Sequence, residues 1–498
     1  MATAGAWPFY LSLFLFLVVC AGYFAIPLWD SDFWWHIASG REIVQHGIPA
    51  VDPFGVFPAT DVVRNDTVLK GQWLGQVVLY GLFDAGGVNA VLGLRVLILL
   101  ACLGWIVWRS RLLGVGPLVL WPVLALVAVL LTKFSGERPQ LLSFLWAALF
   151  FAVLDRAGQP WPAVRDSRWL LLLPVITVLW ANSHGGVLLG VALLVLWSGL
   201  KLFDRGCSQR ERLHWWLATL AVVLASLATP NGLQTYLYLF NLEGSVLQSR
   251  TSEYISAFQL YTLGHHWAQF WVAIYYLLAV VAALMLARQR RWIPLAILLF
   301  LAAISLWSFR YLIFLLIIAS PYLASGLQGL LTNGSLNRPL IAARLSRLPG
   351  YGLLMLILVA VLLTGLVQGR LFRGGVLEQG YPVAIAEFVD ANGLQGRSFN
   401  NMEWGGYLLW RLAPTVQPYI DGRMLDQTRV VPYTHILWAT QQGIRQFERE
   451  HFQLVIMPYH GRFDPQRYRL IDYLHTRPEW RLVYRDATGV VFARTGPQ

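Results

Sequence analysis

The chain has 498 residues, of which 57% are hydrophobic, 14% aromatic and only 13% charged. This composition is typical of a protein with many membrane spans and excludes an ordinary soluble enzyme. The formal net charge of +12 would suggest nucleic acid as the partner of a soluble protein. Here much of the basic excess falls in short loops between apolar runs, which membrane orientation explains better, so we expect no nucleic-acid partner.

The chain begins with an apolar segment over residues 1–26 that shows neither a basic region nor a small-residue cleavage site, so we expect a retained span. Apolar runs of about 15 to 21 residues predict about eleven spans in all. These runs lie near residues 8–28, 89–108, 116–133, 140–154, 169–183, 185–203, 214–229, 268–287, 292–308, 311–331 and 351–369. The three cysteines show no CxxC spacing, which indicates neither a disulfide framework nor a zinc site.

One short apolar stretch, residues 73–83, decides the orientation of the bundle. It is too short to cross alone, so we assign it to the first outer loop, residues 29–88, as a re-entrant or interfacial helix. With that choice the arginine clusters between spans all fall on one side, which the positive-inside rule makes cytoplasmic. The first outer loop, the loop over residues 229–267 and the chain after Arg370 then face outward.

Two carboxylates, Asp30 and Asp32, directly follow the first span, where the chain leaves the hydrocarbon. Acids are expensive near lipid, which makes them candidates for function. Such a carboxylate can take a proton from an acceptor hydroxyl, or it can hold a divalent cation, Mg²⁺ or Mn²⁺, against phosphate oxygens. The alternative is structural, with Asp32 as the N-cap of an interfacial helix over residues 32–45 whose Trp34 and Trp35 lie at headgroup depth.

Basic residues stand at predicted outer ends of later spans. They are Arg138, His184 and Arg310. A cation at this depth can bind the phosphate of a lipid carrier, and arginine does so with a rigid bidentate fork. The alternative for Arg138 is that its long side chain only snorkels toward the interface.

Two further side chains complete the candidate set. Glu253 lies midway in the outer loop over residues 229–267, from which it would complete a metal site with the first-loop acids or orient the acceptor. The alternative for Glu253 is a solvated loop position. His36 falls on the polar side of the first-loop helix, and we group it with Glu253 as acceptor-associated or metal-associated.

From about Gly375 the composition changes to that of a soluble α/β module. Helical patterns separate several of its short β-rich runs, so we expect a small three-layer sandwich. The strands are predicted near residues 398–402, 416–420, 454–457, 480–484 and 490–493, and the helices include residues 430–441 and 465–475.

Two polar motifs of the module, residues 400–407 and residues 419–423, follow predicted strands. Such positions often bind ligands in α/β domains, but the same residues serve equally as a helix cap and a tight turn, which we favour. The module has no GxGxxG motif and no Walker loop. We therefore expect it to be a lid or an acceptor platform and not the catalytic centre.

Together these motifs resemble the GT-C superfamily of membrane glycosyltransferases, which includes protein O-mannosyltransferases, lipid A aminoarabinose transferases and oligosaccharyltransferases. More closely, the chain looks like a large set of bacterial membrane proteins with this architecture whose substrates are mostly unassigned. The resemblance covers most of the chain. Its motifs are Asp30-x-Asp32, His46-Gly47-Ile-Pro49, Gln72-Trp73-Leu74, Arg95, Glu137-Arg-Pro-Gln, Asn182-x-His-Gly-Gly, Trp404-Gly-Gly-Tyr and Asp421-Gly-Arg.

The resemblance implies a polytopic α-helical GT-C-like domain over residues 1–370 and a periplasmic α/β domain over residues 375–498, in a bacterial inner membrane. It also implies transfer of a sugar from a polyprenyl-phosphate donor to a hydroxyl of a glycan, lipid or protein at the outer face. Asp30 matches the first acidic position of the family and Asp32 the second, while Glu253 resembles the late-loop acid of oligosaccharyltransferases.

We expect Asp30 to be the base, and we expect Arg138 and His184 to stabilise the leaving phosphate. The acids of the family are often adjacent, whereas Ser31 intervenes here, which leaves the choice between Asp30 and Asp32 open. A later Asp-x-Asp motif, as found in oligosaccharyltransferases, is missing from the sequence, and this leaves metal dependence open.

Two other classes of function compete with an enzyme. One is a transporter or flippase of lipid-linked saccharides, and the other is an envelope scaffold whose outer module binds other proteins. Transporters should show paired Gly/Pro-broken helices at midplane depth and often an internal repeat. The sequence shows neither, and its charged residues cluster toward one face of the bundle, which favours an enzyme.

The predicted orientation can be tested with a reporter fused after Gln498. The reporter should show periplasmic behaviour, because an odd number of spans that starts in the cytoplasm ends outside. Paired fusions to an enzyme that is active only outside and to a protein that fluoresces only inside measure this. Cytoplasmic behaviour would contradict both the orientation and the placement of the acids at the outer face.

Overall fold

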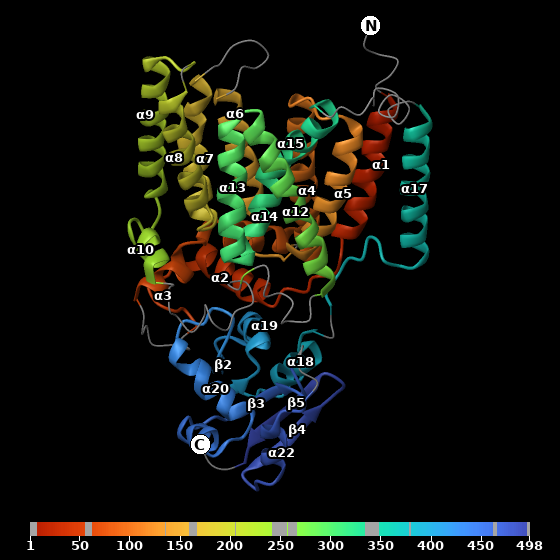
Figure 1. Ribbon diagram of the computed structural model, residues 1–498. Coiled ribbons are helices and arrows are strands. Elements are labelled where there is room, and N and C mark those ends of the chain that lie inside the picture. The colour runs from red at the N-terminus through yellow and green to blue at the C-terminus, as the bar shows by residue number, and fades with distance from the viewer. Residues whose placement is uncertain are drawn as a thin grey trace.

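The computed structural model describes residues 7–54, 62–134, 136–158, 167–204, 206–241, 256, 266–333, 348–377, 380–461 and 466–495. Long helices form a bundle, and a small sheet domain lies beyond one end of that bundle (Figure 1). Short helices of the outer loops lie in a layer between these two parts (Figure 1). The protein thus has the two regions that the change in composition near Gly375 predicts.

The bundle contains helices in each of the predicted apolar ranges. Six candidates among the described residues are long and apolar enough to cross a membrane: Trp7–Phe24, Trp73–Leu112, Pro117–Phe134, Gln140–Gly158, Gln269–Arg288 and Phe309–Leu331. The helices are α1 (Trp7–Phe24), α4 (Trp73–Leu112), α5 (Pro117–Leu131), α6 (Gln140–Gly158), α7 (Leu173–Ser183), α8 (Val187–Phe203), α9 (Gln209–Ser226), α12 (His266–Arg288), α13 (Trp292–Trp307), α14 (Leu312–Phe314), α15 (Ser320–Asn333) and α17 (Leu348–Val367). The total of about eleven spans stays a prediction.

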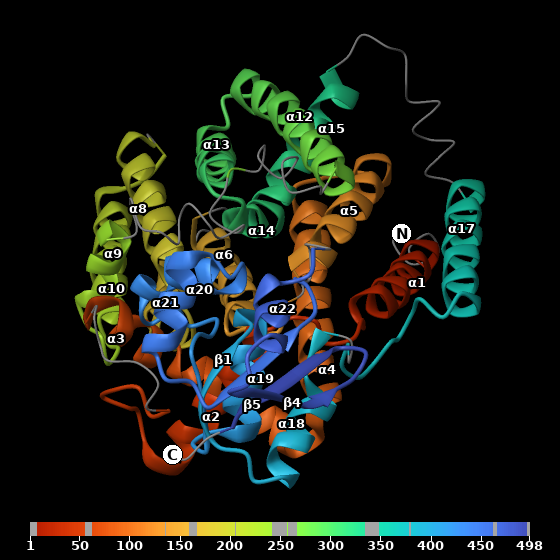
Figure 2. The ribbon, with the colours of Figure 1, turned by 90° about the horizontal axis from the view of Figure 1, so that it is seen from below.

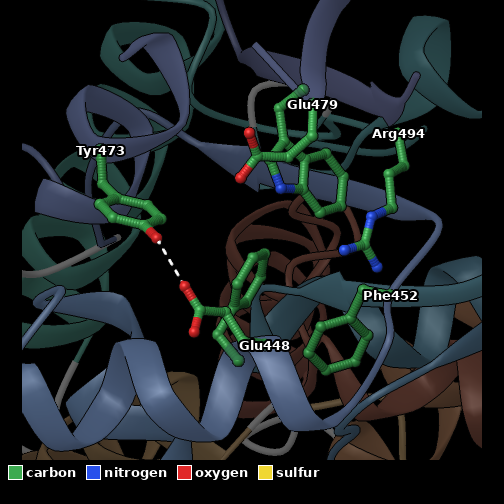
Figure 3. Close-up of a pocket in the computed structure, with 7 residues that line it drawn as sticks. Glu448, Phe452, Tyr473, Glu479 and Arg494 are labelled. Atoms are coloured by element: carbon green, nitrogen blue, oxygen red, sulfur yellow. Dashed lines mark hydrogen bonds between the residues drawn. The ribbon is translucent and has the colours of Figure 1, made fainter. Parts of the chain in front are cut away.

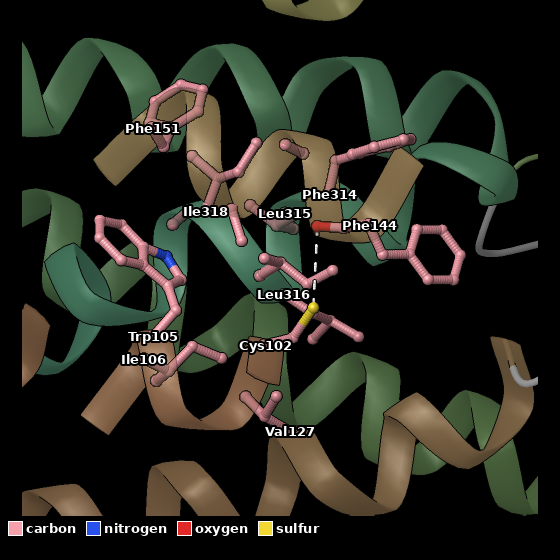
Figure 4. Packing of buried hydrophobic residues seen from close by; sticks show 14 of the residues in the cluster. Cys102, Trp105, Ile106, Val127, Phe144, Phe151, Phe314, Leu315, Leu316 and Ile318 are labelled. Atoms are coloured by element: carbon pink, nitrogen blue, oxygen red, sulfur yellow. Dashed lines mark hydrogen bonds between the residues drawn. The ribbon is translucent and has the colours of Figure 1, made fainter. Parts of the chain in front are cut away.

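The bundle core is built from large apolar side chains on helices that are far apart in the sequence. Around Cys102 of α4, side chains from α6 and from the segment after α14 interdigitate (Figure 4). The Cys102 thiol donates to the carbonyl of Phe144 at 3.7 Å. Helix α17 packs beside α1 at the edge of the bundle (Figure 2).

Helix α4 is broken by non-helical torsions at Gly86 (φ −152°, ψ 17°) and Gly87 (φ 64°, ψ −160°). The segment before the break packs against the sheet domain, because Phe83 and Tyr80 contact Trp410 at ring distances of 5.4 and 6.5 Å. This segment therefore belongs to the layer between the bundle and the domain.

The layer also contains α2 (Asp32–His46), α3 (Val62–Lys70) and α10 (Gln234–Asn241). Helix α2 was predicted to lie in the interface with Trp34 and Trp35 at headgroup depth; its depth stays a prediction, but protein covers both side chains. Both indoles are only 5% exposed. Trp34 packs edge-on against Tyr407 and Tyr381 of the sheet domain at 4.8 and 5.5 Å. The apolar side of α2 is buried by protein and not by lipid.

The C-terminal domain holds a five-stranded sheet in the order β2-β1-β3-β5-β4. Strands β1, β2 and β3 are parallel, whereas β5 runs antiparallel to both β3 and β4. The elements are α18 (Val383–Ala391), β1 (Gly396–Asn400), α19 (Met402–Leu412), β2 (Val416–Pro418), α20 (Val430–Leu437), α21 (Gln441–Arg449), β3 (Leu454–Pro458), α22 (Arg469–His475), β4 (Trp480–Arg485) and β5 (Gly489–Arg494).

The domain has the three layers that the sequence predicts. Side chains of α18 and α19 cover one face of the sheet, and those of α20, α21 and α22 cover the other. The strands alternate between these clusters, so that Ile456 faces α19 while Val455 and Met457 face the opposite layer. A sheet buried on both faces explains why its strands read as continuous apolar runs.

The face of the sheet that α18 and α19 cover shares one hydrophobic cluster with helices α2 and α4. This cluster includes Phe33, Trp34 and Ile37 of α2 together with Trp404 and side chains of the sheet. The backbone reinforces this junction, since the Leu28 N–H donates to Gly375 O and the Leu377 N–H donates to Leu28 O, both at 2.9 Å. The residues just before the acid pair are thus fixed to the start of the domain.

Two adjacent glycines let α19 fit between the sheet and α2. A Cβ at Gly405 would lie 2.7 Å from Asp421 Cα and would overlap the carbonyl of Ile420. A Cβ at Gly406 would face α2 more loosely, 3.1 Å from Ser31 O and 3.2 Å from Trp35 N. The helix cap that we favoured for residues 400–407 is Asn401, whose side chain accepts the N–H of Glu403 at 2.9 Å, and the two glycines add close packing.

These distances predict that Gly405→Ala destabilises the protein more than Gly406→Ala does. Overpacking against backbone costs about 1–3 kcal/mol, whereas the looser contact at Gly406 can relax by a few tenths of an ångström. Thermal unfolding of the two purified variants in the same detergent measures the difference. Equal melting temperatures would contradict the packing described for α19.

Candidate active site

The two acids of the first loop meet Arg138, which follows α5 in the next outer connection. Arg138 Nε donates to Asp30 Oδ2 at 2.6 Å, and Nη1 lies 3.2 Å from Asp32 Oδ2. Asp30 is 3% exposed, Asp32 is 20% exposed and Arg138 is 27% exposed. A single guanidinium therefore bridges both carboxylates at the end of the bundle that faces the C-terminal domain.

Asp30 is the more enclosed acid of the pair. Its Oδ1 accepts the backbone N–H of Asp32 at 3.1 Å, and its carbonyl accepts the N–H of Phe33 at 3.2 Å. Asp30, and not Asp32, thus satisfies the first N–H group of α2. The structural alternative, in which Asp32 caps this helix, is wrong, because Asp32 is already its first residue.

A buried ion pair supports the segment that carries Arg138. Arg95 of α4 donates both to the carboxylate of Glu137 and to the carbonyl of Ile26, and neither charged side chain is exposed. This pair ties α4, the end of the first span and the residue next to Arg138 together. Sequence reasoning recorded Arg95 and Glu137 only as motif positions, since no local pattern shows that they pair.

His36, on the same helix as Asp32, is 2% exposed. Its Nδ1 lies 3.4 Å from Gln76 Nε2, and its ring is tilted by 33° against Trp35 with 3.5 Å between centroids. Burial lowers the pKa of His36 well below its ordinary value, and the nearby guanidinium of Arg138 lowers it further. His36 is therefore a neutral buried side chain at neutral pH, and its acceptor-associated or metal-associated role stays a prediction.

His184 directly follows α7 as its C-cap, and α8 begins at Val187. Its Nδ1 accepts the N–H of Gly186 at 3.0 Å and lies 2.9 Å from Ser143 Oγ. Because a backbone nitrogen can only donate, the ring proton of the neutral imidazole is on Nε2. His184 thus presents an N–H donor, which is a different chemistry from the cation that its position suggested.

The two remaining candidates are Arg310 and Glu253. The ring of Phe309 contacts Phe134 at 4.9 Å, which brings the short helical turn Phe309–Tyr311, and with it Arg310, beside the chain that leads to Arg138. Glu253 lies outside the described residues. The structure thus brings together Asp30, Asp32, Arg138, His36 and His184, and it places Arg310 on an adjoining segment.

The C-terminal domain contributes a second ionic cluster next to the acids. Arg423 donates to both oxygens of Asp421 at 2.8 and 2.9 Å and to Asp52 of the first outer loop at 2.6 Å. Burial alone would lower the pKa of this guanidinium, but the two carboxylates outweigh burial and raise it. Sequence reasoning treated Asp421-Gly-Arg423 as a turn and overlooked Asp52, because their pairing exists only across the domain junction.

A resident metal ion needs several His, Cys, Asp or Glu ligands at one place. Nowhere among the described residues do three His, Cys, Asp or Glu side chains gather as a ligand set. Asp30 and Asp32 already share a guanidinium, which a divalent cation would have to displace. These residues do not fit a resident metal by themselves, and the role of Mg²⁺ or Mn²⁺ stays a prediction.

A separate small pocket opens on the C-terminal domain (Figure 3). Its lining includes Glu448, whose carboxylate accepts the hydroxyl of Tyr473 at 3.1 Å, together with Arg494 and Phe452. Phe452 belongs to the cluster on the sheet face that is covered by α20, α21 and α22. The pocket is therefore on the side of the sheet turned away from the acid pair.

Comparisons with known proteins give the fold of the chain. No protein-family model matches it, and neither does any curated protein. The chain is similar to the Archaeoglobus fulgidus oligosaccharyltransferase, solved with Zn and sulfate, with a TM-score of 0.56 and 9% identity over 91% of this chain and 68% of that one. It is also similar to apo ArnT from Cupriavidus metallidurans, with a TM-score of 0.53 and 16% identity over 99% of both chains. The chain therefore shares its overall fold with these two proteins.

Proposed function

We propose that the protein is a glycosyltransferase that moves a sugar from a polyprenyl-phosphate-linked donor to a hydroxyl acceptor at the outer face of a bacterial inner membrane. The observation that carries this proposal is the bridge of two carboxylates by Arg138 at the end of an apolar bundle. Charges are expensive beside lipid, so their concentration there supports a chemical role. The fold shared with an oligosaccharyltransferase and ArnT supports the same class of reaction.

The acid pair supplies the base. A base must reach the proton that it removes, and Asp32 is 20% exposed whereas Asp30 is only 3% exposed. Both oxygens of Asp30 accept hydrogen bonds, one from Arg138 and one from the Asp32 backbone. We therefore assign the base to Asp32 and give Asp30 the task of holding Arg138 and the start of α2, which reverses the expected order.

The donor phosphate lies against Arg138 and the Nε2–H group of His184. A guanidinium has five N–H donors, so Arg138 is able to hold the acids and a phosphate oxygen at once. Arg138 and His184 both lie near His36, which supports a common site for the two donors. Arg310 stands on the adjoining segment as a further phosphate ligand.

The reaction is a single displacement. Asp32 takes the proton of the acceptor hydroxyl while the hydroxyl oxygen attacks the anomeric carbon. The bond between that carbon and the phosphate oxygen breaks, and polyprenyl phosphate leaves with the electron pair. Hydrogen bonds from Arg138 and His184 stabilise the charge that develops on the leaving phosphate. Phosphate is a good leaving group, so no acid is required on that side.

The acceptor enters beside the C-terminal domain, which we assign as a lid or acceptor platform. The domain touches the acid-bearing loop through Gly422, where an added Cβ would lie 3.2 Å from Asp32 Cγ. An acceptor hydroxyl that approaches Asp32 therefore has to pass next to this domain.

Substitution of the two acids tests their roles. Asp32→Asn keeps the size of the side chain but cannot take a proton, so turnover should fall about a hundredfold or more with donor affinity retained. Asp30→Asn weakens the hold on Arg138, so the donor KM should rise. Release of polyprenyl phosphate from a panel of radiolabelled polyprenyl-phosphate hexoses by the purified protein measures both effects.

The opposite pattern would change the assignment. If Asp30→Asn abolishes turnover and Asp32→Asn stays active, Asp30 is the base. If both variants keep full activity, the first outer loop is not the active site, and the proposed transfer loses its physical support.

The phosphate ligands are tested by binding. Arg138→Lys replaces the fork by a point charge, and His184→Phe removes the Nε2–H donor while keeping a ring. Loss of one charge-assisted hydrogen bond should weaken the binding of polyprenyl phosphate about tenfold or more. Ligand-induced thermal stabilisation of the purified protein measures the affinity, with the uncharged polyprenol as the matched control lipid. Unchanged affinity for polyprenyl phosphate in both variants would remove these residues from the phosphate site.

A further inference from the structure

The turn after β2 is the part of the C-terminal domain that reaches the acid pair. Its Arg423 is completely buried and is held by Asp421 from the same turn and by Asp52 from the first outer loop. The guanidinium also lies 5.0 Å from the ring centre of Phe54, two residues after Asp52. The turn is therefore fixed to the loop that carries the acids and not only to its own domain.

Gly422, in the middle of this turn, faces Asp32. A Cβ at Gly422 would overlap Asp32 Oδ1 and would lie 3.2 Å from the indole nitrogen of Trp35. The φ angle of Gly422 is outside the left-handed region, so the backbone conformation itself accepts alanine. The glycine is required by the proximity of Asp32 and not by the shape of the turn.

Asp32 is thus confined from two sides by different parts of the chain. Arg138 of the bundle approaches Oδ2 at 3.2 Å, and the backbone of Gly422 lies against Oδ1. The two constraints fix both the position and the rotation of the carboxylate. A carboxylate that has to accept a proton along one direction gains from such confinement, because a misplacement of about 1 Å can reduce a rate about a hundredfold.

We propose that Gly422 and Arg423 are positioning residues, through which the docked C-terminal domain sets the geometry of Asp32. This inference rests on the proposed glycosyl transfer and adds to it a requirement. The membrane domain carries the acids, but their productive arrangement needs the turn of the C-terminal domain. The salt bridge between Arg423 and Asp52 holds that turn in place.

A double-mutant cycle tests the role of Gly422. Gly422→Ala should lower kcat about tenfold to a hundredfold with little change in the donor KM, because it displaces the base and leaves the phosphate ligands in place. In the background of Asp32→Ala the overlapping oxygen is gone, so Gly422→Ala should change the residual rate by less than about twofold. The same fold-loss in both backgrounds would overturn the proposal, since the alanine would then act independently of Asp32.

Asp52→Asn provides a second variant that keeps the fold. Arg423 remains paired with Asp421, so its buried charge is still compensated while the tie to the first loop is weakened. Asp52→Asn should lower kcat in the same direction as Gly422→Ala. Arg397→Met is the matched control, because it breaks the Arg397 to Glu450 ion pair within the same domain at a 43% exposed side chain. Equal kinetics of Asp52→Asn and Arg397→Met would overturn the role of the Arg423 bridge.

Hydrogen exchange gives a readout that does not depend on the transfer reaction. The amides at the start of α2 should exchange faster in Gly422→Ala and Asp52→Asn than in the unaltered protein, and Arg397→Met should leave them unchanged. This measurement remains valid if the protein transfers none of the sugars offered, so failure of the proposed function and failure of the positioning role are distinguishable. Unchanged exchange in both junction variants would refute the positioning role.

Discussion

The structure depends on the burial of helix α2 between two domains. One side of α2 packs on the first segment of α4, and the other side receives α19 of the C-terminal domain. The acids at the start of α2 therefore take their positions from both domains. This arrangement also explains why hydrogen bonds and ion pairs cross the junction, such as the hydrogen bond that Arg41 donates to the carbonyl of Trp410 at 3.3 Å. A charged group that loses water at such a junction needs a partner.

The charged groups around Asp30 and Asp32 also have partners, as burial at the junction requires. Two carboxylates share one guanidinium in the site, while a neutral His36 on the same helix as Asp32 adds no charge. Buried ions near the site are paired, among them Arg95 with Glu137, and Arg423 with Asp421 and Asp52. Removing one member of a buried pair costs about 3–5 kcal/mol, so these pairs fix the framework. Asp32 and Arg138 are partly exposed, so a ligand can contact these two charged groups.

Several features of the fold could be read from the sequence because they rest on local periodicity. Each strand of the C-terminal sheet lies within two residues of its predicted range, for example β3 at Leu454–Pro458. The helix of the first loop begins at Asp32 as expected. The amphipathic pattern of that helix marks a face to be buried, but it carries no information on what buries that face. Headgroup lipid and a second protein domain place the same demand on Trp34 and Trp35.

The sequence by itself determined the membrane character of the chain, the change to an α/β module and the choice of Asp30, Asp32, Arg138 and His184 as candidate residues. Composition and residue type decide these properties, because burial in lipid and phosphate chemistry select particular side chains. Only the tertiary structure decided which acid is enclosed, which nitrogen of His184 donates, and that Asp52 pairs with Arg423 while Gly422 lies against Asp32. Asp52 and Arg423 are 371 positions apart in the chain, and their contact exists only once both domains have folded and docked.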